Sequence, residues 1–144
     1  MLRKPSFILA VLLGLATAPA FAYSGTTVDV NVPFSFIIQG KVLPAGQYQL
    51  MQTTVQDNQW VIQNVKNDSQ QAMFTTEQED VTHSRGDTYV SFKEVNHKEY
   101  LSDIWTEGSD QGWHVPVALE LAQGSHQQPK MHMIKASVRA RSSR

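Results

Sequence analysis

The sequence predicts an all-β fold, a sandwich or partly closed barrel of about seven to nine short antiparallel strands. Apolar and polar residues alternate with a period of two in most segments, which is typical of half-buried strands. Clusters of turn-forming residues recur about every 8 to 12 residues. No cysteine occurs in the 144 residues, so burial and backbone pairing have to stabilise the fold without disulfides.

The first 22 residues have the layout of a secretory signal peptide. Two basic residues supply a positive start, an apolar stretch spans residues 7–16, and Ala20 and Ala22 provide a small-residue cleavage site. The apolar stretch is shorter than the roughly 20 residues of a spanning helix, so we expect no transmembrane segment after cleavage. We therefore expect residues 1–22 to be a signal peptide. Residues 23–144 are expected to be a single exported β-rich domain, periplasmic or extracellular.

The first two strands are expected at the start of this domain. Residues 26–32 alternate, with three valines on one face. Pro33 cannot donate a ladder hydrogen bond, so it belongs at an edge or a bend. The alternation restarts after it, and a second strand is expected at residues 34–38.

The motif Gly-Lys-Val-Leu-Pro-Ala-Gly after the second strand predicts a turn. Pro44 presets φ for a turn, and Gly40 and Gly46 tolerate positive φ. We expect the strand at residues 34–38 to form a β-hairpin, through this turn, with a returning strand at residues 47–54.

Five further strands show the same alternation. They are expected at residues 59–65, 71–77, 88–95, 100–105 and 132–141. Asn-His-Lys-Glu predicts a turn between the third and fourth of these, and residues 106–112 predict a loop. We expect Trp113, beside that loop, to be the most exposed tryptophan. Residues 116–123 have Pro near the start and Gly just past the end, which favours a short helix, although their alternation leaves a strand open.

Charge is distributed unevenly. All 13 acidic residues precede Lys130, whereas the stretch from Lys130 to Arg144 carries five basic residues. On the last expected strand the basic residues share one face; they include Lys135, Arg139 and Arg141. Such a face predicts an anionic partner, for example lipid head groups or a polysaccharide, and the alternative is a solvated last strand. We expect no nucleic acid partner.

Two blocks of sequence resemble a family of small exported β-rich proteins of unknown function that is abundant in Acidobacteria. The first block has the pattern V-x-V-P-F-x-F-x-x-G-x-x-x-L-P-A-G-x-Y; its matching residues are Val30, Val32, Pro33, Phe34, Phe36, Gly40, Leu43, Pro44, Ala45, Gly46 and Tyr48. The second block is matched by Phe92, Tyr100, Leu101, Ile104 and Trp105. The resemblance implies the β-rich fold and export, and it brings no activity and no catalytic residue with it.

The sequence contains no recognisable catalytic, cofactor or metal-binding motif. No two of the five histidines have the i, i+4 spacing of a metal pair. Met131 and Met133 flank His132, but on a strand they face away from it, so this triplet alone does not form a copper site. Candidate acids and bases for a hydrolase are Asp80, His83, Asp87, Glu94, Asp103 and Glu107.

We therefore expect a non-enzymatic envelope protein that binds a partner or supports a structure outside the cytoplasm, without a cofactor. Two alternatives remain open. A lipocalin-like carrier of a small apolar ligand needs an interior cavity. A hydrolase acting on envelope polymers needs at least two of the candidate acids and bases to converge in a cleft.

Overall fold

The computed structural model of the chain describes residues 25–53, 58–80, 86–116 and 129–139, in which all regular structure is β. Within these residues the strands are β1 (Thr27–Val32), β2 (Phe36–Ile38), β3 (Lys41–Leu43), β4 (Gly46–Gln52), β5 (Gln59–Asn64), β6 (Gln71–Thr75), β7 (Glu77–Asp80), β8 (Tyr89–Val95), β9 (Lys98–Trp105), β10 (Gln111–His114) and β11 (Lys130–Val138). The described residues contain no helix that is long and apolar enough to cross a membrane.

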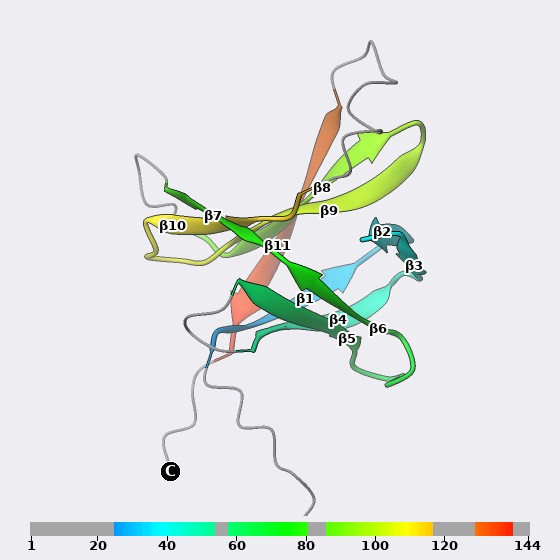
Figure 1. Ribbon diagram of the computed structural model, residues 1–144, viewed down its shortest axis with the longest axis horizontal. Coiled ribbons are helices and arrows are strands. Elements are labelled where there is room, and N and C mark those ends of the chain that lie inside the picture. Colours follow the sequence, from blue (N-terminus) through cyan, green and yellow to red (C-terminus); the bar gives the residue numbers. More distant parts are fainter. Residues whose placement is uncertain (1–24, 54–57, 81–85, 117–128, 140–144) are drawn as a thin grey trace, which may run out of the picture.

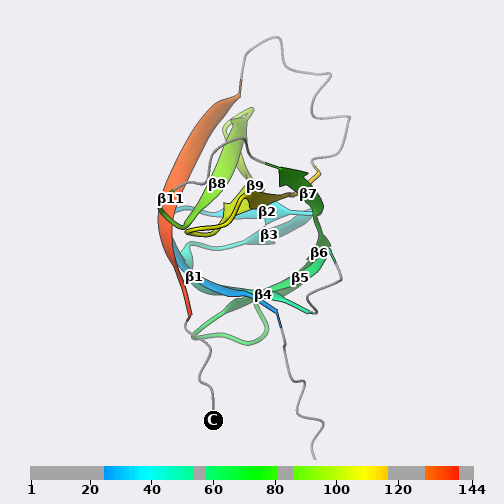
Figure 2. The same cartoon turned by 90° about the vertical axis from the view of Figure 1, so that its left-hand side faces the viewer.

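The strands form one strongly curved sheet, a nearly closed barrel. Their order is β3-β2-β9-β8-β11-β1-β4-β5-β6, and β10 pairs with both β9 and β7. β11 joins the two halves of the barrel, because it pairs with β8 along its first part and with β1 along its last part. Figure 1 and Figure 2 show this strand passing from the β8–β9 side to the β1–β4 side.

The barrel is not closed by strand pairing between β3 and β6, the two ends of the strand order. A side-chain contact crosses this seam: the Lys41 Nζ atom donates to the carbonyl oxygen of Gln71. The seam leaves the two short strands at the ends with one unpaired edge each in this strand order.

Alternate residues of the strands point into the barrel and fill it. The largest fully buried side chains are Trp60, Tyr48, Phe36, Phe74 and Phe92. The ring of Phe36 is edge-on to those of Tyr48 and Phe92, whereas Trp60 and Phe74 are stacked. Burying a side chain of this size stabilises the fold by about 1.5–3 kcal/mol. The interior is thus a packed core, which does not favour the carrier alternative.

The all-β fold and the partly closed barrel are confirmed, but two details of the prediction are wrong. The described residues form eleven strands, not seven to nine, because the short strands β3, β7 and β10 were not predicted. β7 is exposed along its whole length, so it shows no apolar alternation. The sheet is also not wholly antiparallel, since β2 pairs in parallel with β9 at Ile37 and Tyr100.

The predicted hairpin between residues 34–38 and residues 47–54 is wrong as well. β2 forms its tight hairpin with β3, and Gln39 and Gly40 have φ of 43° and 81° at the turn. β4 instead pairs with β1 and β5. Gly46 has no positive φ; it lies at the start of β4, where a Cβ atom would come within 2.9 Å of Asn64 Nδ2.

The Pro-Ala-Gly-x-Tyr segment has a structural role that differs from the predicted turn. The hydroxyl of buried Tyr48 donates to the carbonyl oxygen of Pro44 at 2.6 Å. This bond fixes the link between β3 and β4 and satisfies a hydroxyl inside the core.

Two other predictions concern Trp113 and the segment 116–123. Trp113 is half-buried, as is Trp105, and it packs on the core with its ring centroid 5.1 Å from that of Trp60, so it is not an exposed loop residue. Pro116 belongs to no helix, and the rest of the segment 116–123 lies outside the described residues, as do the signal-peptide residues 1–22.

Candidate functional site

A tight hairpin positions the first candidate site. β8 and β9 pair from Tyr89 to Val95, and the turn between them places Asn96 and His97 at φ of 52° and 62°. Positive φ at both central residues is the mark of a type I′ turn, for which Asn is favoured at the first position. The turn brings Glu94 and Glu99 directly opposite each other.

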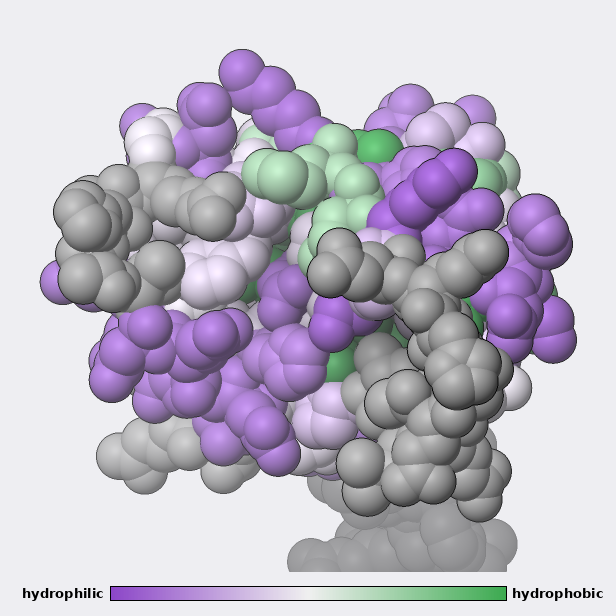
Figure 3. All heavy atoms as spheres, turned by 90° about the horizontal axis from the view of Figure 1, so that it is seen from above, coloured by the Kyte–Doolittle hydropathy of each residue, from purple (hydrophilic) through white to green (hydrophobic). Residues whose placement is uncertain are grey.

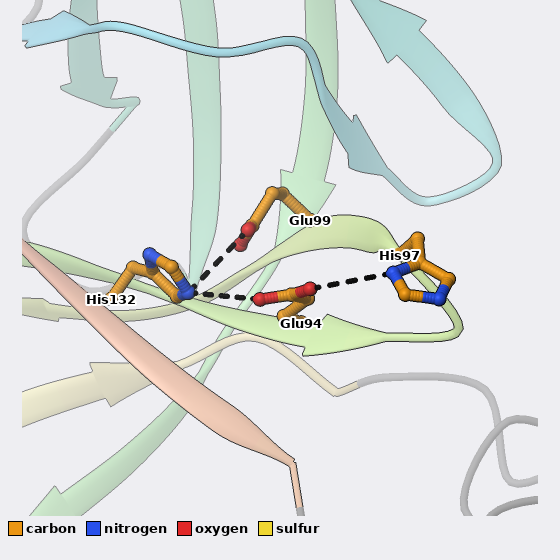
Figure 4. A network of polar contacts seen from close by, with 4 residues as sticks. All are labelled: Glu94, His97, Glu99 and His132. Atoms are coloured by element: carbon orange, nitrogen blue, oxygen red, sulfur yellow. Dashed lines mark hydrogen bonds and ion pairs between the residues drawn. The ribbon is translucent and has the colours of Figure 1, made fainter.

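Glu94, Glu99 and His132 form a group that we call the hairpin cluster. His132 lies on β11, next to β8, and its Nε2 atom is 3.1 Å from Glu94 Oε2 and 3.6 Å from Glu99 Oε1. Figure 4 shows the three side chains pointing toward one another. His97 lies beside them on the turn, with its Nδ1 atom 3.9 Å from Glu94 Oε1 and its side chain almost fully exposed.

The cluster lies on the inward face of the sheet at the end of the core. His132 is opposite Phe92 in the β8–β11 register. The ring of Phe34, which follows Pro33, lies edge-on to His132 at 5.9 Å and to Phe92 at 5.1 Å. These apolar rings cover one side of the cluster, while the side chain of His132 is 39% exposed on the other. Polar atoms in such a setting interact more strongly than in bulk water.

The carboxylate of Glu99 lies in the least favourable environment of the three cluster side chains. Its Oε2 atom is buried and has no hydrogen-bond partner, and its side chain is 13% exposed. Burial raises the pKa of Glu99, the negative charge of Glu94 raises it further, and His132 opposes both. A buried carboxylate oxygen without a partner destabilises a fold, so its presence calls for an explanation.

A metal ion bound here would neutralise the two carboxylates, and binding through both oxygens of Glu99 would also give Oε2 a partner. One ligand atom from each residue of the cluster lies within 4.8 Å of the other two. Around a four-coordinate zinc ion with bonds of about 2.0–2.2 Å, ligand atoms lie roughly 3.3–3.6 Å apart. The distance from His132 Nε2 to Glu99 Oε1, 3.6 Å, is at the upper end of this spacing, and that to Glu94 Oε2, 3.1 Å, is slightly shorter. Imidazole with carboxylates is a donor set used for zinc.

A second group of polar residues lies on the opposite, outward face of the same sheet. A hollow of about 420 Å³, which we call the outer groove, is lined by Glu79, Asp103, Trp105, His114, Met131 and Met133 among others. A β-bulge places Asp103 there. The register shifts between Ser91 and Phe92, so that Leu101 and Ile104 both point inward and Asp103 points outward.

Asp103 is held by three hydrogen bonds. Its Oδ1 atom is 2.8 Å from Nδ1 of His114, and the hydroxyls of Ser91 and Ser102 donate to its Oδ2 atom at 2.8 and 2.7 Å. Burial alone would raise the pKa of Asp103, but the bonds from His114, Ser102 and Ser91 outweigh it and lower the pKa. Asp103 is therefore an ionised carboxylate with its lone pairs engaged.

The candidate acids and bases within the described residues do not converge on one cleft. Glu94 and Asp103 lie on opposite faces of the β8–β9 hairpin. Asp80, Asp87 and Glu107 are exposed, and His83 lies outside the described residues. The hairpin cluster and the Asp103–His114 pair were missed because their members come from separate strands, and only Glu94 and Asp103 were candidates.

The basic face of the last strand is confirmed only in part. Lys135 on β11 is exposed. Arg139 lies 3.3 Å from Asp29 on β1, so an acidic residue already engages it. Arg141 lies outside the described residues. The anionic partner stays a prediction.

No protein-family model, no curated protein and no solved structure matches this chain. The hairpin cluster therefore has to be interpreted from its own geometry.

Proposed function

We propose that this protein is a non-enzymatic, exported envelope protein that binds a divalent cation of the zinc class at the hairpin cluster. Glu94, Glu99 and His132 would each supply one ligand atom. The observation that carries the proposal is the convergence of one ligand atom from each residue within 4.8 Å, where Glu99 is largely buried and its Oε2 atom has no hydrogen-bond partner.

The alternative account of the cluster is a plain ion pair, in which a protonated His132 lies between two carboxylates. That account explains the distances from His132 Nε2, but a single imidazolium balances only one of the two carboxylate charges. A bound cation would stabilise the charged form of Glu99 and neutralise its repulsion with Glu94. The metal-binding account is therefore the better one.

A binding role is favoured over a hydrolytic one by the surroundings of the cluster. Among the described residues, the other histidine–carboxylate pair with a short contact, Asp103 with His114, lies on the opposite face of the sheet. A metallohydrolase needs a general base within reach of the metal-bound water. His97 is the nearest such group, and it belongs to a fully exposed turn.

The test is calorimetric titration of Zn²⁺ into metal-free mature protein that carries no histidine tag. The wild type should bind one Zn²⁺ at this site. Glu99→Gln should weaken binding at least tenfold, because losing even an outer-shell partner costs about 10–100-fold in metal affinity. Glu107→Gln, an exposed carboxylate outside the cluster, is the matched control and should bind like the wild type.

His97→Ala distinguishes the core of the site from its edge. Because His97 is almost fully exposed and 3.9 Å from Glu94, its removal should change the affinity for Zn²⁺ by less than about threefold. Wild-type protein that binds no Zn²⁺, or an unchanged affinity in Glu99→Gln, would refute the proposal.

A further inference from the structure

The outer groove crosses five neighbouring strands on the outward face of the sheet. Met131 and Met133 on β11 line one end, β8 and β9 form the middle, and His114 on β10 and Glu79 on β7 line the other end. Neighbouring strands lie about 4.8 Å apart, so the strands that line the groove span roughly 19 Å. The groove is therefore long enough for an oligomeric ligand that lies across the face of the sheet.

Two aromatic rings form part of the floor of the groove. Trp105 and Tyr89 are cross-strand neighbours, and their ring planes are within 28° of parallel at a centroid distance of 6.1 Å. The indole of Trp105 lies across Gly112 on β10, because a Cβ atom there would come within 2.6 Å of three of its ring carbons. The missing side chain at Gly112 thus lets the half-buried indole lie flat along the floor.

Hydrogen-bonding groups stand on both sides of this floor. The ionised carboxylate of Asp103 holds Nδ1 of His114 at 2.8 Å, so Nδ1 carries the proton and Nε2 of the neutral ring is an acceptor. Within the part of the chain that the structure describes, the side chains of Lys93 and Glu79 form no hydrogen bond or ion pair. The groove therefore offers a donor, the Lys93 ammonium group, and two acceptors to a ligand.

We propose that the outer groove binds a neutral oligosaccharide, with a sugar ring lying on the indole of Trp105. Hydroxyl groups of the sugar bond to Lys93, Glu79 and Nε2 of His114. The electron-rich face of an aromatic ring attracts the C–H groups on the face of a sugar ring. A hydroxyl group both donates and accepts, and its hydrogen bonds to charged side chains are about twice as strong as neutral ones. The site shares no residue with the hairpin cluster and does not rest on the function proposed for it.

The lining of the groove disfavours other ligands. An anionic polymer would meet the carboxylates of Glu79 and Asp103, and a metal ion would meet the ammonium group of Lys93. An extended peptide typically binds along an unpaired strand edge, whereas β8 and β9 are paired on both sides. Met131 and Met133, 48% and 56% exposed, add an apolar wall. Figure 3, which looks down on the molecule of Figure 1, shows hydrophobic side chains among hydrophilic ones, a mixture that suits a sugar.

The test begins with binding of unlabelled mature protein to a printed array of neutral oligosaccharides, acidic oligosaccharides and peptides. Calorimetric titration with the best-binding oligosaccharide follows, in chelator so that a metal ion plays no part. Trp105→Ala should weaken binding about tenfold or more, and Trp105→Phe should keep part of the affinity. Glu79→Gln and Lys93→Gln should each weaken it by about threefold or more. Lys98→Gln, at an exposed lysine outside the groove, is the matched control and should bind like the wild type.

Gly112→Ala tests the orientation of the indole without removing a group that contacts the sugar. The new Cβ atom would displace the ring of Trp105, so the affinity for the same oligosaccharide should fall by about tenfold. Gly86→Ala, whose Cβ atom meets nothing within 4 Å, is the control and should bind like the wild type. Circular dichroism of each variant shows whether a loss of binding reflects loss of the fold.

Wild-type protein that binds no neutral oligosaccharide on the array would overturn the proposal. Equal affinities of the wild type, Glu79→Gln and Lys93→Gln would also overturn it, even if Trp105→Ala does not fold. Binding of acidic oligosaccharides alone, lost in Lys93→Gln, would instead assign the groove to an anionic polymer. Binding of the printed peptides alone, lost in a folded Trp105→Ala, would assign it to a peptide.

Discussion

The Nε2 atom of His132 lies 3.1 Å from the Oε2 atom of Glu94, although 38 residues separate the two along the chain. The contact exists because β11 pairs with β8, and the tight β8–β9 turn brings Glu99 to the same place. Three adjacent strands therefore deliver an imidazole and two carboxylates to one point on the inward face. The same strand β11 delivers two thioethers to the outward face.

Glu99→Gln should stabilise the metal-free protein. The substitution removes a buried charge that repels Glu94, so we expect the melting temperature in chelator to rise by about 2–4 °C. Because the pKa of Glu99 is raised, the folded state holds this proton more tightly than the unfolded state does. Wild-type stability therefore falls as the pH rises from the ordinary value of 4.5, and the gap between the two proteins should open over that range.

Differential scanning fluorimetry between pH 4 and pH 8 measures this gap. A variant that melts below the wild type at neutral pH in chelator would show that the Glu99 charge stabilises the fold. It would contradict the account of Glu99 as a residue that is strained without metal.

Asp103→Asn should destabilise the protein at neutral pH by about 1–3 kcal/mol, because an acceptor for Ser91, Ser102 and His114 is lost. The pKa of Asp103 is lowered, so its stabilising effect is present above its ordinary value of 3.8 and is lost as the pH falls through the lowered value. Urea denaturation at pH 7 and pH 3 measures both. Asp87→Asn, at an exposed carboxylate, is the control. Equal urea midpoints for the wild type and Asp103→Asn at pH 7 would contradict a stabilising role for the hydrogen bonds of Asp103.

Substituting three glycines by alanine should give three different results. Gly40→Ala should lower the free energy of unfolding by about 1 kcal/mol, because the φ of Gly40 is 81°, although the space around it is open. Gly46→Ala should lower the free energy of unfolding by about 1–2 kcal/mol, because the new Cβ atom would lie 2.9 Å from Nδ2 of Asn64. Gly86→Ala meets nothing within 4 Å and should leave the urea midpoint unchanged. A Gly46→Ala variant as stable as Gly86→Ala would refute the close approach.

Tyr48→Phe should destabilise the fold by about 1 kcal/mol without changing its topology. The substitution keeps the buried ring and removes only the hydroxyl that donates to Pro44 at 2.6 Å. Chemical denaturation should show a lower midpoint with an unchanged slope. An unchanged midpoint would mean that water replaces the hydroxyl at no cost.

The sequence was sufficient to predict the strands that bury one face. β1, β5 and β8 each place alternate apolar residues in the core, and this alternation is visible in the sequence. β7 and β10 could not be predicted in this way, since their residues are polar or form part of a turn-like stretch. Periodicity reports which residues are buried, and it carries no signal for a strand that is paired but exposed.

Strand partners and sites were harder to predict than strands. The hairpin of β2 was assigned to β4 because Pro44 and Gly46 were interpreted as the turn, whereas Gly40 makes it. The position of Asp103 depends on a bulge that has no mark in the sequence. The hairpin cluster depends on the pairing of β11 with β8 across a long separation, which no local motif encodes.

The most direct measurement is an anomalous difference map at the zinc edge, from crystals of the exported domain grown with one equivalent of Zn²⁺. The account predicts a peak about 2 Å from His132 Nε2 and from one oxygen each of Glu94 and Glu99. The absence of a peak there, with His132 still hydrogen-bonded to Glu94, would contradict it and leave the cluster as an ion pair.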